Sequence, residues 1–207
     1  PEEATLPADR PRPAVASYRG ATHEVTVPAV THVALTGLAR ETGTTLFMVA
    51  QAAVATVLAR CGAGVDVPIG SPVAGRTDEA LDDLVGFFVN TLVLRTDVGG
   101  DPTFRELLAR VRETDLAAWA HQDLPFDRLV EVLNPERSAS RHPLFQVMLT
   151  VGDTAADAPD LAGLEAAFLD PELRIAKFDL TFAFGERRAA DGGPGGLDIT
   201  VEYATDL

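Results

Sequence analysis

The sequence has little cysteine and few basic residues, and these shortages limit the class of protein. One cysteine, Cys61, excludes an internal disulfide and is typical of a reducing compartment. The 17 Lys and Arg against 31 Asp and Glu give a formal net charge of −14, which argues against a general binder of nucleic acid or anionic membranes. No apolar run approaches the roughly 18 residues of a membrane span, and the N-terminus resembles no signal peptide. These features predict a soluble cytoplasmic chain cut from a longer protein.

Several motifs of catalysis and ligand binding are also missing. The 4 histidines are scattered without metal-ligand spacing, so no metal site is predicted. The sequence has no Walker loop, no Gly-x-Gly-x-x-Gly and no Gly-x-Ser-x-Gly elbow. Cys61 ends an apolar helical pattern, which favours a core or rim position over a nucleophile. No phosphate cradle and no hydrolase nucleophile are therefore expected.

The sequence does contain alternating helical and strand-like segments, in a chain that is 46% hydrophobic and 23% charged. This order predicts an α/β fold, a layered α/β sandwich with a mixed sheet. Residues 1–14, rich in proline, are expected to form a lead-in or linker, and residues 15–207 the folded unit. The expected strands cover residues 16–29, 65–70, 86–98, 144–151, 164–169, 177–186 and 196–204.

Specific residues predict where the helices begin and end. Gly43 can end the first helix in a left-handed cap, and Thr44 or Thr45 can cap the second. Asp101 and Pro102 together predict an N-cap followed by a proline at the first helical position of the third helix.

Asn90 is a polar residue within the apolar run FFVNTLVL. A buried amide without hydrogen bonds costs about 1–3 kcal/mol, so this side chain needs partners. It can bond a neighbouring backbone at a bulge, or it can face a cavity at the end of the strand. Strand alternation places Phe88, Asn90 and Leu92 on one face.

The stretch HQDLPFDRLV, residues 121–130, also has two interpretations. The structural one makes it the start of a helix: Asp123 accepts backbone N–H groups, Pro125 opens the helix and Asp127 lies at its positive end. The alternative makes His121 a catalytic residue, but no carboxylate or nucleophile stands at a suitable spacing. We favour the structural interpretation. The apolar face of this helix, expected to be buried, consists of Phe126, Leu129, Val130 and Leu133.

Three stretches occur in an order that resembles a known family. They are VGFFVNTLVLR (85–95), HQDLPFDRLV (121–130) and RSASRHPLFQVM (137–148). They resemble the three downstream signature motifs of nonribosomal peptide synthetase condensation domains. LPADRPRP, GSPVAGR (70–76) and EYATDL are similar to that family as well. The sequence departs from the family at Asp127, Ser138 and His142, where Glu, Asp and Asn or Ser are common.

The resemblance implies the C-terminal lobe of a two-lobed domain, in which each lobe has the fold of chloramphenicol acetyltransferase. The family's active-site motif HHxxxDG has no match here, so no catalytic residue is assigned to this chain. The implied reaction forms an amide when the amine of an aminoacyl thioester attacks an acyl thioester. Phosphopantetheine arms of carrier domains hold both substrates, and the chain itself binds no cofactor. The implied partners are the N-terminal lobe, the donor and acceptor carrier domains and an adjacent adenylation domain, but neither nucleic acid nor membrane.

The resemblance also implies roles for individual residues. Gly86, Phe88 and Asn90 would form a wall of the substrate tunnel. Ser71, Gly75 and Arg76 would belong to a segment that crosses the lobe junction and floors that tunnel; locally, the pattern around Ser71-Pro72 and Gly75 predicts an irregular turn after a short strand. Arg137 and Arg141 would hold the junction between helix and strand, and His121, Asp123, Pro125, Phe126 and Asp127 the start of the preceding helix.

The variant FVNT favours condensation over epimerisation or heterocyclisation. Three alternatives stay open. They are a catalytically degenerate docking module, a dual condensation/epimerisation domain, and an acyltransferase lobe that self-associates.

Overall fold

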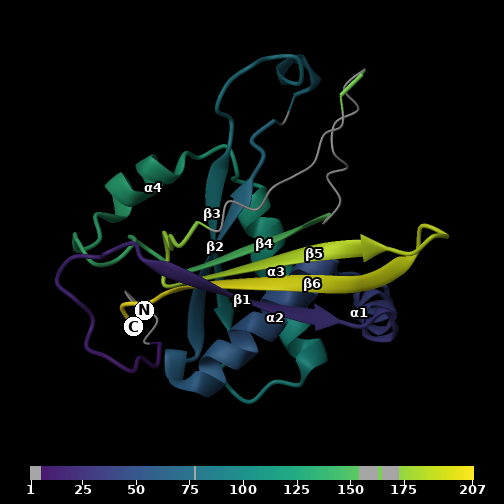
Figure 1. The fold of residues 1–207 in the computed structure, drawn as a ribbon, viewed down its shortest axis with the longest axis horizontal. Helices are drawn as coiled ribbons and strands as arrows, with labels where there is room; N and C mark the ends of the chain where they lie inside the picture. The colour runs from purple at the N-terminus through teal and green to yellow at the C-terminus, as the bar shows by residue number, and fades with distance from the viewer. Residues whose placement is uncertain (1–5, 77, 154–162, 165–172) are drawn as a thin grey trace.

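The protein forms a mixed sheet with helices packed against one face (Figure 1). The structure, a computed structural model, describes residues 6–76, 78–153, 163–164 and 173–207. The predicted α/β class with a mixed sheet is confirmed. The strands are β1 (Gly20–Val27), β2 (Asp66–Val73), β3 (Asn90–Asp97), β4 (Val147–Asp153), β5 (Leu180–Arg188) and β6 (Pro194–Ala204). The helices are α1 (Ala29–Thr42), α2 (Leu46–Leu58), α3 (Phe104–Trp119) and α4 (Phe126–Leu133).

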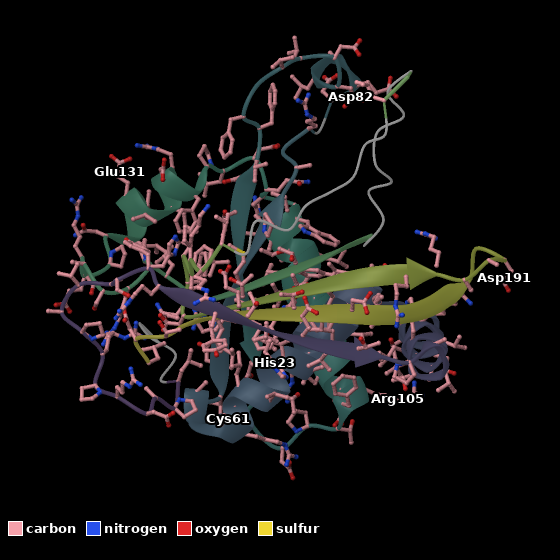
Figure 2. The ribbon with its side chains drawn as sticks, in the orientation of Figure 1. His23, Cys61, Asp82, Arg105, Glu131 and Asp191 are labelled. Atoms are coloured by element: carbon pink, nitrogen blue, oxygen red, sulfur yellow. The ribbon has the colours of Figure 1, made fainter. Side chains whose placement is uncertain are left out.

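The six strands have the order β1-β6-β5-β4-β2-β3. Strand β4 runs parallel to both of its neighbours, whereas the β1–β6, β5–β6 and β2–β3 pairs are antiparallel. The glycine-rich stretch between β5 and β6 makes the hairpin connection expected from the sequence, with Asp191 at its tip (Figure 2).

Helix α2 is the centre of the core. One cluster joins its Ala55 and Leu58 to Val67 and Ile69 of β2 and to β4, and a second cluster joins α1, α2 and α3. By length and composition alone, Leu46–Ala63 is apolar enough to cross a membrane, but 50% of this segment is buried inside the fold. The same apolarity is what a core helix between a sheet and two other helices requires.

Two of the three predicted helix boundaries are confirmed. Gly43 ends α1 with a φ of 64°, in the left-handed region, and the Thr45 side chain accepts from the Met48 N–H to cap α2. The prediction for α3 is wrong, because its N-cap is Thr103. Thr103 and Glu106 form a capping box in which each side chain bonds the other's backbone N–H. This reciprocal pair satisfies two N–H groups, whereas Asp101 lies outside the helix with a φ of 52°.

Two predictions about strands are corrected. The sequence around Ser71 and Pro72 forms no turn, because β2 continues to Val73. The pairing of β2 with β4 covers Ile69 and Gly70, so Pro72 lies past it and its missing N–H interrupts no bond to β4.

The buried strand expected over 86–98 begins only at Asn90, and Phe87 before it is 90% exposed. The strand expected from 144 begins at Val147, and the strand expected at 164–169 lies almost wholly outside the described residues.

Candidate functional site

The chain leaves the sheet between β2 and β3 as a long projecting segment, the arm, which comprises residues 74–76 and 78–89 (Figure 1). Val73 and Asn90 face each other where the arm departs and returns. Gly75 there has a φ of 66°, and a Cβ on it would lie 1.9 Å from the carbonyl oxygen of Phe88. Only glycine allows this close approach of the two sides of the arm.

We call the place where the two sides of the arm contact each other the neck; it consists of Gly75, Arg76, Gly86 and Phe88. Arg76 joins its two sides. Its guanidinium lies 4.3 Å from the centre of the Phe88 ring, and Nη2 donates to the Leu84 carbonyl at 2.7 Å. A Cβ on Gly86 would lie 3.0 Å from the same ring. The structure therefore brings together Gly75 and Arg76, assigned to the lobe junction, with Gly86 and Phe88, assigned to the tunnel wall. Ser71 is not among them, because it is buried within β2 opposite Leu92.

Beyond the neck, the arm exposes apolar and acidic side chains. Val85 and Phe87 are 105% and 90% exposed, and Leu84 and Val89 about half. Asp82 lies far from the sheet in Figure 2, near a short 3-10 turn, Glu79–Leu81, that the Asp78 side chain caps. Adjacent apolar side chains that stand in solvent on a projecting segment are typical of an interaction surface.

The side chain of Asn90 binds the loop before α4. Its Nδ2 donates to the carbonyls of Gln122 and Leu124, both at 2.8 Å, and its Oδ1 accepts from the Phe126 N–H at 3.0 Å. Both amide N–H groups and one acceptor are thus used by backbone groups more than 30 positions away. The side chain therefore does bond backbone, as the first interpretation expected, although the backbone belongs to a distant loop and not to a bulge.

These bonds correct the predicted start of α4. The N-cap is Pro125, without a side-chain cap of its own, and Asn90, not Asp123, satisfies the first N–H of the helix. Asp127 lies in the first turn, where the helix dipole favours it. His121 is exposed, and its carbonyl accepts from the Leu124 N–H at 3.1 Å to form the preceding turn. The structure thus joins two stretches that the sequence treated separately.

An aromatic cluster joins the third stretch to the second. Phe126 stacks on His142 at 5.4 Å between ring centroids, and Phe145 and Phe178 contact the His142 ring at 4.3 and 4.9 Å. Burial among these rings lowers the pKa of His142, and its bonds to the carbonyls of neighbouring backbone oppose this only in part. Phe145 is 0% exposed and packs over Gly70, where a Cβ would lie 2.2 Å from the ring.

The sequence analysis did not identify Phe145 and Phe178 as parts of the aromatic cluster that joins the second and third stretches, nor Gly70 as a contact of that cluster. One signal was present: a glycine inside a strand pattern marks the close approach of another group. Phe178 gave no comparable signal.

Helix α4 is less buried than predicted. None of its residues is buried, and Leu133 is 58% exposed. Phe126 holds the helix at one end through the aromatic cluster, while the far end extends into solvent (Figure 1). The expectation of a fully buried apolar face is therefore wrong.

Arg137 and Arg141 lie on the exposed segment between α4 and β4. Arg141, Arg12 and Lys177 are among the residues that line a cavity of about 390 Å³. Arg12 forms an ion pair with Asp179 and donates to the Ser140 carbonyl at 3.1 Å, which ties residues before β1 to this segment. Among the described residues, no group of three or more His, Cys, Asp or Glu could hold a metal ion.

Comparison with known proteins defines the class. The family model of the condensation domain matches residues 1–207, so the chain belongs to the condensation domain family. It is 56% identical to a probable non-canonical nonribosomal peptide synthetase, CymA, of Salinispora arenicola, over 100% of the chain and 3% of that protein. It is 53% identical to a dimodular nonribosomal peptide synthase of Bacillus subtilis, over 100% of the chain and 9% of that protein. The chain thus spans less than a tenth of these two relatives.

Two solved structures have a closely similar fold. The X-domain from teicoplanin biosynthesis superposes with a TM-score of 0.94 at 37% identity, over 100% of this chain and 46% of that one. A four-domain nonribosomal peptide synthetase bound to AMP and glycine superposes with a TM-score of 0.87 at 26% identity, over 100% and 16%. The fold described above is therefore that of condensation domains and X-domains.

Proposed function

We propose that this chain is the C-terminal half of a condensation domain that forms amide bonds in nonribosomal peptide synthesis. The observation that carries the proposal is the arm, whose exposed apolar side chains fit a partner lobe. The partner is the N-terminal lobe of the same domain. Donor and acceptor carrier domains and an adjacent adenylation domain complete the assembly, in the cytoplasm, and the chain binds no cofactor of its own.

In the proposed reaction, the amine of the acceptor aminoacyl thioester attacks the carbonyl of the donor acyl thioester. The new C–N bond forms as the C–S bond breaks, the donor's phosphopantetheine thiol is released, and the amine loses a proton. The N-terminal lobe supplies the histidine that orients or deprotonates the amine. This chain contributes position, because holding two tethered reactants in register accelerates an attack between them.

Gly86, Phe88 and Asn90 would present one wall of the tunnel, and Gly75 and Arg76 would fix the arm across the lobe junction. The neck supports this assignment, since Arg76 over Phe88 and the contact at Gly75 hold both sides of the arm at one angle. The Asn90 amide is engaged by the loop before α4, so its share of the wall would be to hold that loop. Arg137, Arg141 and the start of α4 would support the wall from behind.

The test is Val85→Asp in the intact parent protein, assayed for dipeptide formation with loaded donor and acceptor carriers. Full burial of a valine contributes roughly 1.5–3 kcal/mol, and a buried unpaired carboxylate costs more, so turnover should fall by more than about tenfold. Val30→Asp is the matched control, because Val30 is 76% exposed in the first turn of α1, where an acidic residue is tolerated. We also expect no dipeptide from the 207-residue chain alone. Unchanged turnover of Val85→Asp would refute the role of the arm.

A docking module without chemistry is the second candidate. The likeness to the X-domain favours it, because one such structure, 36% identical with a TM-score of 0.90, is a complex of the X-domain and OxyB from teicoplanin biosynthesis. The same assay separates the two candidates. A docking module gives no dipeptide above the carrier-only background even when the intact domain is unaltered, whereas the condensation domain does.

A further inference from the structure

Three polar side chains are buried together where α2, β3 and α3 meet. Gln51, Thr96 and Asp115 are 0%, 1% and 0% exposed. Nε2 of Gln51 donates to Oγ1 of Thr96 at 3.1 Å and to Oδ1 of Asp115 at 3.0 Å. These two bonds use both N–H groups of the amide.

Two atoms of this triad have no hydrogen-bond partner within the described part of the chain: Oε1 of Gln51 and Oδ2 of Asp115. They belong to the same two groups that the Nε2–Oδ1 bond already joins. An ionised Asp115 could satisfy neither atom, because a carboxylate and an amide oxygen both only accept. A protonated Asp115 carries one O–H donor, and a bond from Oδ2 to Oε1 of Gln51 satisfies both atoms at once.

The surroundings of Asp115 offer no charge that would stabilise a carboxylate. Helix α2 has no charged residue. His32 of α1 is buried elsewhere, where its Nδ1 accepts from the Gly196 N–H at 3.3 Å and its Nε2 lies 3.4 Å from Glu186. The other charged residues of these elements are exposed, with one exception: Arg40 and Glu41 of α1, Arg95 and Asp97 of β3, and Arg105, Glu106, Arg112 and Glu113 of α3. The exception, Arg110 of α3, is half-buried, and its Nη1 donates to the carbonyls of Asp97 and Gly99 at 3.2 and 2.8 Å.

We propose that Asp115 is held as a neutral carboxylic acid that forms a cyclic pair with the Gln51 amide, and that this pair is a pH-sensitive lock between α2, β3 and α3. Of its two hydrogen bonds, the one from Gln51 Nε2 to Oδ1 is available to either form of Asp115, whereas the one from Oδ2 to Oε1 exists only in the protonated form. Loss of the proton breaks one bond and leaves a buried carboxylate facing an amide oxygen. The inference is independent of the proposed function, since it rests on the core alone.

The direction of the pH response follows from the proton. Burial raises the pKa of Asp115 from 3.8 to about 6, against a smaller lowering effect of the Gln51 bond. The folded form thus binds this proton more tightly than the open form. The stability that the proton contributes is complete below pH 3.8 and is lost as the pH rises through about 6.

The experiment is hydrogen exchange of the full-length protein, followed in peptides of α2 and α3 and corrected for the pH dependence of intrinsic exchange. The opening equilibrium of these helices should increase about tenfold between pH 5 and pH 8, given a shift in pKa from 3.8 to about 6. Equal protection of these peptides at both pH values in the unaltered protein would overturn the proposal, and this result needs no variant.

Asp115→Asn is the matching variant, because its amide can donate to Oε1 of Gln51 without titrating. Its protection should be the same at pH 5 and pH 8 and should exceed that of the parent at both, because the parent has the full stabilisation from the proton only below pH 3.8. The control Asp82→Asn makes the same substitution on the exposed arm, and protection of α2 and α3 should then depend on pH as it does in the parent. An Asp115→Asn protein that keeps the parent's full response would assign the response to another group and refute the lock.

Discussion

Asn90→Ala should destabilise the loop before α4 far more than the sheet in which Asn90 lies. The substitution removes three hydrogen bonds to backbone groups of residues 122–126. A neutral hydrogen bond contributes about 0.5–1.5 kcal/mol net, and the loss of a helix cap costs about 0.5–2 kcal/mol. Water can replace part of each bond because the side chain is only half-buried. We therefore expect a local loss of about 2 kcal/mol.

Hydrogen exchange of peptides that cover residues 120–133 measures this loss. A change of about 2 kcal/mol in the opening free energy accelerates exchange about 30-fold, while peptides of β2 and β6 should be unaffected. Thr91→Ala is the matched control, since Thr91 is the neighbour of Asn90 in β3 and its side chain points to the other face.

Asn90→Asp separates the hydrogen-bonding role from a general need for a polar residue. A carboxylate still accepts from the Phe126 N–H, but it has no donor for the Gln122 and Leu124 carbonyls and faces both with negative charge. This variant should accelerate hydrogen exchange of residues 120–133 at least as much as Asn90→Ala does. Unchanged exchange of residues 120–133 in both variants, combined with reduced turnover, would refute the reasoning and make Asn90 a direct contact of the substrate.

Two further substitutions test local geometry. Gly75→Ala should destabilise the neck of the arm by more than about 1 kcal/mol, because a φ of 66° strains an alanine and its Cβ would lie 1.9 Å from the Phe88 carbonyl oxygen. We expect faster proteolysis within residues 74–89, and resistance equal to that of the parent would contradict the prediction. Thr103→Ala should lower the unfolding free energy by about 1 kcal/mol through loss of the capping box, measured by urea denaturation, whereas Asp101→Ala, at the cap position that the sequence suggested, should change it less.

Local rules predicted the features that depend on neighbours in sequence. Gly43 ends α1 and Thr45 caps α2 because a left-handed glycine and a threonine hydroxyl act within one turn. The same rules chose Asp101 and Asp123 wrongly. Helix α3 is capped by Thr103 and Glu106, which form a reciprocal capping box. At the start of α4, the Phe126 N–H donates to Asn90, which lies on β3 and is distant in sequence.

The arm was misread for a different reason. Phe87 and Val89 belong to a run with few polar residues and no helical period, so the sequence predicted a buried strand over 86–98. The pattern reports only that these side chains are apolar, and it does not tell whether residues of the same chain or of a partner contact them. Within the described part of this chain the residues are exposed, and their burial is therefore expected in a partner.

The three stretches that carry the family resemblance contact one another in the fold. Asn90 of the first bonds the backbone of the second, and Phe126 of the second stacks on His142 of the third. Phe145 of the third packs over Gly70, which begins the segment that leads into the arm. Each stretch thus fixes the position of the next, from the neck of the arm to the strand beneath it. A substitution anywhere along this series should therefore change the angle at which the arm leaves the sheet.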